Sequence, residues 1–205
     1  MKYPGKFVAF EGIDRAGKSS VVKVMPDLLT GCRVPIKVCA EYKSPLRELI
    51  VGDALKNRSP FQKIFLFAAD RAWTYESECL PALERGELVL WDRYKDSAIA
   101  YRAADLSLRP SDLFDLDFVK AINLPFLTPN KTFLIDITVE VSQERAEKNN
   151  LKEQYDPDLL ERVRLEYHKL ASAPEYAIVD GARSTEAVAE QIAKEIRTGF
   201  PQFFK

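Results

Sequence analysis

The 205-residue sequence contains one histidine, His168, and only three cysteines, Cys32, Cys39 and Cys79. A single histidine nearly excludes a Ser-His-Asp triad and a metal site built from several histidines. The cysteines are odd in number and lack the paired spacing of a zinc site, so we interpret them as buried thiols in a reducing compartment. These absences favour a cytoplasmic protein whose chemistry rests on other side chains.

Strong net charge and long apolar runs are also missing. The formal net charge is −1 and the isoelectric point is about 6.0, which argues against a nucleic-acid partner because nucleic-acid surfaces are usually basic. No apolar run approaches the length of a membrane span, and the N-terminus lacks the features of a signal peptide. We expect no membrane partner, and a chain of this length forms one domain with a substantial core.

The most informative stretch lies near the start. Residues 7–11 have the pattern of a short buried strand and lead into G-x-x-x-x-G-K-S, followed by a helical pattern. Backbone N–H groups of such a loop surround a polyphosphate, and Gly17 lets the chain pass close to it. Lys18 supplies charge to the phosphates and Ser19 offers a hydroxyl to Mg²⁺. The predicted nucleotide loop comprises Gly12, Ile13, Asp14, Arg15, Ala16, Gly17, Lys18, Ser19 and Ser20.

Five strand-like runs alternate with helical patterns along the chain. The runs are 7–11, 35–40, 88–91, 132–137 and 176–179. This alternation predicts βαβ crossovers and therefore a three-layer α/β/α fold with a five-stranded parallel sheet. Ligands of such sheets bind at the carboxyl ends of the strands. The acidic residues there are Glu11, Glu41, Asp92, Asp136 and Asp180, and we expect the first three to face the site.

The intervening segments predict helices, a loop and a flap. Pro26 predicts a kink or an early end in the first helix, and Gly86 predicts the end of the third. Residues 105–127 are helical in part and are interpreted as structural. A polar stretch that ends in Pro157 predicts a flap over 146–157. The predicted helices span 17–29, 46–55, 60–83, 140–148, 158–171 and 184–196, the last with Ser184 as its N-cap.

A second chemical motif follows the third strand, where four apolar residues lead into Asp92-Arg93-Tyr94. An Asp at this edge of the sheet can hold Mg²⁺, directly or through water, and the adjacent Arg can bind a phosphoryl group. Ser97 and Tyr101 are four residues apart and therefore share one face of the helix that follows. The structural alternative is a solvated ion pair at the end of a strand.

Together these motifs resemble the thymidylate kinases, the enzymes that phosphorylate dTMP with ATP, over nearly the whole chain. The phosphate loop by itself is shared with many ATPases and GTPases. The Asp14-Arg15 pair inside it and Asp92-Arg93-Tyr94 are more specific. Nothing resembles the Asn-Lys-x-Asp element that reads guanine in GTPase switches. The segments that carry the resemblance are 10–19, 66–71, 92–101 and 179–184.

The resemblance implies a P-loop NTPase-type fold, a single kinase domain over 1–205, Mg²⁺, the substrates ATP and dTMP, a role in dTTP synthesis, and a homodimer formed through helices around 61–83. The catalytic residues that it implies are Arg15, Lys18, Asp92 and Arg93, with Ser19 and Asp92 at the metal. The ATP site that it implies consists of the loop residues together with Arg145, Gly181, Ala182 and Arg183. The dTMP site that it implies comprises Asp14, Lys43, Phe67, Arg71, Arg93, Ser97, Tyr101 and Arg102.

Within that site, the resemblance implies that Phe67 stacks on thymine, Arg71 hydrogen-bonds the base and Tyr101 packs against the sugar. Two positions depart from the family pattern. The usual arginine after the second strand is missing, so Lys43 and Arg47 are the candidates for its replacement. The position after Tyr101, often glutamine, is Arg102. The alternatives are a kinase of the same fold for another nucleoside monophosphate or a deoxynucleoside and, from another class, a nucleotide-binding switch.

Overall fold

The computed structural model describes residues 3–51, 54, 58–150 and 155–204. One sheet with the strand order β2-β3-β1-β4-β5 lies at the centre, and neighbouring strands in it are parallel. The predicted five-stranded parallel sheet is therefore confirmed, with each strand boundary within one residue of its expected position. The strands are β1 (Lys6–Glu11), β2 (Ile36–Ala40), β3 (Leu88–Asp92), β4 (Lys131–Asp136) and β5 (Tyr176–Asp180).

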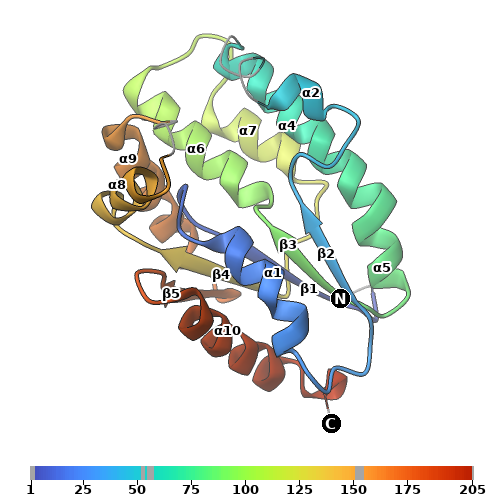
Figure 1. Ribbon diagram of the computed structural model, residues 1–205. Helices are drawn as coiled ribbons and strands as arrows, with labels where there is room; N and C mark the ends of the chain where they lie inside the picture. The colour runs from blue at the N-terminus through green and yellow to red at the C-terminus, as the bar shows by residue number, and fades with distance from the viewer. Residues whose placement is uncertain (1–2, 52–53, 55–57, 151–154, 205) are drawn as a thin grey trace.

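Helices surround this sheet (Figure 1) and bury both of its faces. Successive side chains of a strand point to opposite faces, and β1 shows the consequence. Val8 and Phe10 join the cluster that includes α1 (Lys18–Leu28) and α10 (Thr185–Gly199), whereas Phe7 and Ala9 join the one that includes α5 (Leu80–Glu84). The helices are α1 (Lys18–Leu28), α2 (Arg47–Ile50), α4 (Pro60–Thr74), α5 (Leu80–Glu84), α6 (Lys95–Leu108), α7 (Leu116–Asn123), α8 (Val139–Lys148), α9 (Pro157–Leu170) and α10 (Thr185–Gly199).

Two helical predictions differ from the structure in detail. Helix α1 continues past Pro26 to Leu28, so of the two outcomes expected there, a kink or an early end, the early end is wrong. Proline has a φ compatible with a helix and lacks only its own N–H bond, so the two residues after it remain helical. The predicted helix 60–83 is divided into α4, the π-helical turn η1 (Tyr75–Cys79) and α5. As predicted, it ends before Gly86, which has a φ of +83°. Part of the predicted helix 46–55 lies outside the described residues.

The predicted flap 146–157 begins in the last turn of α8 and reaches the first residue of α9, and residues 151–154 of it lie outside the described residues. Ser184 caps α10 as predicted, because its side chain accepts a hydrogen bond from the backbone N–H of Ala187. The three cysteines are free thiols, of which Cys39 and Cys79 are buried. Among the described residues, no helix combines the length and the apolar character that a membrane crossing requires.

The topology places the site. Strand β1 lies between β3 and β4. The strands that follow β1 in the chain, β2 and β3, lie on one side of it, and β4 and β5 lie on the other side. The loop after β1 is therefore at the point where the strand order reverses. In the register of β1 and β3, Phe10 is opposite Asp92. The loop after β1 and the Asp92-Arg93-Tyr94 turn after β3 therefore meet at one edge of the sheet, as the sequence predicts.

Candidate functional site

The loop from Gly12 to Ser19 curves tightly around the side chain of Lys18. Gly12 has a φ of +145°, and a Cβ there would lie 2.4 Å from the carbonyl oxygen of Ile135, so a larger residue would clash with β4. Lys18 Nζ donates hydrogen bonds to the carbonyl oxygens of Gly12 and Ile13, at 2.9 and 2.6 Å. Burial, together with the nearby Arg93, lowers the pKa of Lys18 to about 7. The ammonium thus lies on the inner side of the loop, where a polyphosphate would bind.

Ser19 and Asp92 supply oxygens suited to a magnesium ion. Ser19 Oγ donates a hydrogen bond to Asp92 Oδ2 at 2.5 Å. Asp92 Oδ1 is buried and has no hydrogen-bond partner among the described residues. Mg²⁺ in nucleotide sites takes one or two protein oxygens, together with phosphate oxygens and water. The two side chains therefore fit the ion, although the described residues contain no group of three or more acidic, histidine or cysteine ligands.

Asp14 and Arg93 join the phosphate loop to the turn after β3. The Arg93 guanidinium pairs with Asp14 Oδ1, and the Tyr101 hydroxyl donates to the same oxygen at 3.0 Å. Burial opposes ionisation of Asp14, but Arg93 and Lys18 hold its pKa below the ordinary value. The backbone of Arg93 has a φ of +61°, and its N–H donates to the carbonyl of Phe10. The loop carboxylate therefore orients the predicted phosphate-binding arginine.

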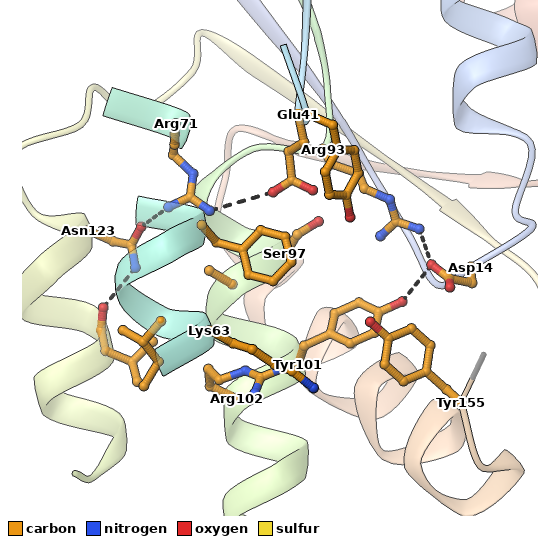
Figure 2. Close-up of a pocket in the computed structure, with 15 residues that line it drawn as sticks. Asp14, Glu41, Lys63, Arg71, Arg93, Ser97, Tyr101, Arg102, Asn123 and Tyr155 are labelled. Atoms are coloured by element: carbon orange, nitrogen blue, oxygen red, sulfur yellow. Dashed lines mark hydrogen bonds and ion pairs between the residues drawn. The ribbon is translucent and has the colours of Figure 1, made fainter. Parts of the chain in front are cut away.

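A cavity of about 250 Å³ lies beside this pair, between α4, α6 and α7. Its apolar lining includes Ile64, Phe67 and Val119, which suits a planar base. Figure 2 shows the charged and polar side chains that surround it. Most of the predicted dTMP site is brought together here, namely Asp14, Phe67, Arg71, Arg93, Ser97, Tyr101 and Arg102. Lys43 is exposed and is not among the described residues that line the cavity.

Arg71 is the most buried cation of the cavity, with 1% of its surface exposed. Its Nη1 donates to Asn123 Oδ1 at 2.8 Å, and its Nη2 lies 3.7 Å from Glu41 Oε1. The Nε and Nη2 atoms have no hydrogen-bond partner among the described residues. Burial raises the pKa of Glu41 to about 7, while Arg71 and Arg93 act in the opposite direction. Arg71 therefore has N–H groups available for a ligand.

Glu11 does not face the cavity, contrary to the expectation from its place at a strand end. It is fully buried, and its carboxylate accepts hydrogen bonds from the Tyr94 N–H, the Ser97 hydroxyl and the Tyr167 hydroxyl. Glu11 thereby connects β1 to the turn after β3, to α6 and to α9. Ser97 lines the cavity, but its hydroxyl hydrogen is directed to Glu11.

Of the predicted ATP residues outside the loop, Arg145 contacts the loop directly. Arg145 donates from Nη1 to the carbonyl of Arg15 at 2.9 Å and from Nη2 to the carbonyl of Gly181 at 2.6 Å. It therefore ties the phosphate loop to the turn after β5. Gly181 is buried against β4, whereas Ala182 and Arg183 are exposed. The Arg183 guanidinium donates to the side chain of Gln191 in α10.

The sequence analysis missed several cavity residues, namely Tyr42, Lys63, Asn123 and Tyr155. Tyr42 has a φ of +63°, and its N–H is held by Asp70 of α4. Tyr155 lies at the end of the predicted flap, with its ring 5.2 Å from that of Tyr101. Asn123 belongs to the segment interpreted as structural. A single asparagine after an apolar helical pattern carries no signal by which the sequence could have identified it.

Comparison with known proteins agrees with this geometry. The family model described as "Thymidylate kinase" matches residues 10–192. A "Probable thymidylate kinase" of Methanosarcina barkeri is 33% identical, covering 94% of this chain and 96% of its own length. A "Thymidylate kinase" of Bifidobacterium longum is 32% identical, over 94% and 98% of the two chains. One of Fervidobacterium nodosum is 34% identical, over 92% and 96%.

Proposed function

Because the chain belongs to the thymidylate kinase family, we propose that it transfers the γ-phosphoryl group of ATP to dTMP. One observation carries the proposal. The Asp14–Arg93 pair stands between the phosphate loop and the cavity, and both residues line that cavity. A phosphoryl group on the loop and an acceptor in the cavity would therefore meet at the same arginine.

Phosphoryl transfer needs little covalent chemistry from a protein, so the residues act by positioning and by neutralising charge. Lys18 and Arg15 would act on the phosphates of ATP, and Arg93 on the group in transfer. Ser19 and Asp92 would hold Mg²⁺, which supplies charge neutralisation at the phosphates. Arg145, Gly181, Ala182 and Arg183 would form the nucleotide site beyond the loop.

The cavity supports dTMP as the acceptor. Phe67 would stack on the base, Arg71 would donate hydrogen bonds to it and Tyr101 would pack against the sugar. Arg102 lies at the same cavity and forms an ion pair with Asp105 at 2.6 Å. The acceptor phosphate is assigned to Arg93, with Ser97 beside it. Lys43 would add to it only if the loop after β2 moves, because Lys43 is exposed.

The proposal extends to the organisation of the protein. The 205 residues would form one kinase domain with a flap over 146–157, acting in the cytoplasm in dTTP synthesis without a nucleic-acid or membrane partner. A homodimer through α4 is supported by two large apolar side chains of this helix, Phe65 and Trp73, which are 48% and 40% exposed. Exposed apolar groups of this kind mark protein interfaces.

A coupled assay of ATP consumption with Mg²⁺ tests the proposal, using dTMP, dUMP, UMP, CMP, AMP, GMP and thymidine as acceptors. We expect a strong preference for dTMP. Activity spread over several monophosphates would retain the phosphate chemistry and overturn the assignment of the base site. Slow hydrolysis that no acceptor stimulates would instead support a nucleotide-binding switch, which no feature of the described residues favours.

A further inference from the structure

Asn123, at the end of α7, makes a hydrogen bond that orients Arg71. Arg71 Nη1 donates to Asn123 Oδ1 at 2.8 Å, and both side chains line the cavity (Figure 2). Asn123 is 3% exposed, so water cannot easily replace it as the acceptor. Glu41 lies 3.7 Å from Arg71 Nη2, which is beyond hydrogen-bond range. Glu41 therefore attracts the guanidinium without fixing its orientation.

The asparagine is itself fixed in orientation. Its Nδ2 donates to the carbonyl oxygen of Val119, one turn earlier in α7, at 2.8 Å. Since the amide nitrogen is directed to a carbonyl, the amide oxygen must face Arg71. The burial of a neighbouring residue and one contact with an aromatic ring support the arrangement. Val119 is fully buried in the cavity wall, and the Arg71 guanidinium lies 5.5 Å from the centre of the Phe126 ring.

This arrangement leaves the Nε and Nη2 donors of a buried arginine without a hydrogen-bond partner among the described residues. Buried donors are normally satisfied, so unused ones inside a ligand cavity indicate a ligand acceptor. Arginine has hydrogen-bond donors only. It can therefore bind a carbonyl oxygen, but it cannot form a hydrogen bond with the N–H groups of an amino group. Thymine carries a carbonyl oxygen where cytosine carries an amino group, so Arg71 can distinguish the two bases only while its orientation is fixed.

We propose that Asn123 is a positioning residue that holds Arg71 at the cavity wall with its Nε and Nη2 donors left for a ligand, and that it thereby sets the preference for a base with a carbonyl oxygen over one with an amino group. The inference rests on the proposed function. Without Asn123, the guanidinium is free to turn toward Glu41 and form a close ion pair. Glu41 would then occupy these donors, although every group assigned to phosphate would remain in place.

The test compares Asn123→Ala, Asn123→Leu and Asn123→Asp by steady-state kinetics with dTMP and dCMP. A hydrogen bond to a charged group contributes enough that we expect Asn123→Ala to raise the KM for dTMP about tenfold. The kcat and the KM for ATP should stay within about twofold, and the preference for dTMP over dCMP should fall about tenfold. Asn123→Leu keeps nearly the same shape and should reproduce this result if the alanine variant is too unstable to assay. Asn123→Asp keeps an oxygen acceptor and should restore most of the preference.

Two controls separate positioning from structure. Asn130 accepts a hydrogen bond from the Phe7 N–H at 2.8 Å, away from the cavity, so Asn130→Ala should lower thermal stability without changing the preference. In an Arg71→Ala background, Asn123→Ala should cause no further rise in KM, because residues that act as a unit are not additive. An unchanged KM and preference in Asn123→Ala, or a full effect without Arg71, would overturn the inference.

The wild-type protein is assayed first, which keeps the two failures distinct. If it phosphorylates a monophosphate other than dTMP, the proposed function fails, and the Asn123 series is repeated with that preferred acceptor. If it prefers dTMP and the Asn123 variants share that preference unchanged, the inference about Asn123 fails alone.

Discussion

The phosphate loop and the acceptor cavity meet at Asp14 and Arg93, but they are built in different ways. The loop is one continuous stretch, and its backbone supplies much of its chemistry. The cavity collects side chains from separate regions of the chain, including Glu41 after β2, Arg71 of α4, Tyr101 of α6 and Asn123 of α7. A local site is recognisable from spacing, whereas an assembled site requires every one of its elements to be placed.

The two regions also satisfy their polar groups differently. In the loop, the buried Lys18 ammonium donates hydrogen bonds to two backbone carbonyl oxygens. In the cavity, the buried Arg71 retains two nitrogen atoms without a hydrogen-bond partner among the described residues. The loop is thus held together by its own backbone, while the cavity presents donors to a ligand. Substitutions in the loop and substitutions in the cavity should therefore change different kinetic constants.

The largest effect is expected at the loop. Lys18→Ala removes the charge that we assign to the phosphates, and loss of one such stabilising group lowers kcat by about 10²- to 10³-fold. Because Lys18 does not line the cavity, the affinity for dTMP, measured by calorimetry, should be nearly unchanged. A comparable loss of dTMP affinity would contradict the separation of the two regions.

At the cavity, we expect a smaller effect, and we expect it on the KM for dTMP rather than on kcat. Arg71→Lys keeps a positive charge near Glu41 but loses the planar set of donors. The KM for dTMP should rise about tenfold, a typical result of losing one hydrogen bond to a charged group. The KM for ATP serves as the internal control and should stay constant. An equal rise in both constants would show that the variant acts through the fold.

Glu41 allows a test that uses stability. Its pKa in the folded protein, about 7, lies above the ordinary 4.5, so the folded state holds the proton more tightly. The contribution of Glu41 to the free energy of unfolding is therefore greatest below pH 4.5. This contribution, about 3 kcal/mol at most, is lost as the pH rises to about 7. Glu11 contributes in the same direction, because its pKa is also raised to about 7 by burial.

The measurement is urea unfolding at pH 5.5 and pH 7.5. Glu41→Gln should reduce the difference in unfolding free energy between the two pH values by about half, since Glu11 remains. The exposed pair of Arg47 and Glu48 offers a matched control, and Glu48→Gln should leave the difference unchanged. An unchanged difference in the Glu41 variant would mean that this carboxyl ionises normally in the folded protein.

The smallest effect is expected at Lys43. It is exposed and outside the cavity lining, so Lys43→Ala should change the KM for dTMP by less than about twofold. Arg47→Ala, the other candidate from the family pattern, provides the comparison. A tenfold rise for either variant would show that the loop after β2 brings a cation to the acceptor phosphate when substrate binds.

The sequence predicted the sheet, the loop and the Asp92-Arg93 turn because their information is local. Alternation of strand and helix patterns determines a parallel sheet, and the spacing of Gly12, Gly17 and Lys18 determines a phosphate loop. The prediction that Glu11 faces the site was wrong, because a carboxylate at a strand end looks the same in sequence whether it faces a ligand or accepts buried hydrogen bonds. The sequence analysis missed Asn123 for the same reason, since α7 reaches Arg71 only in three dimensions.

By itself, then, the sequence determined the class of fold, the nucleotide loop and the family resemblance, because each of these is recognised from patterns within short segments of the chain. Only the tertiary structure decided which side chains surround the cavity. It buried Glu11, left Lys43 exposed and placed Asn123 against Arg71. The physical reason is that a side chain's role depends on burial and on partners from distant segments, as for Arg71 and Asn123, which are 52 positions apart in the chain.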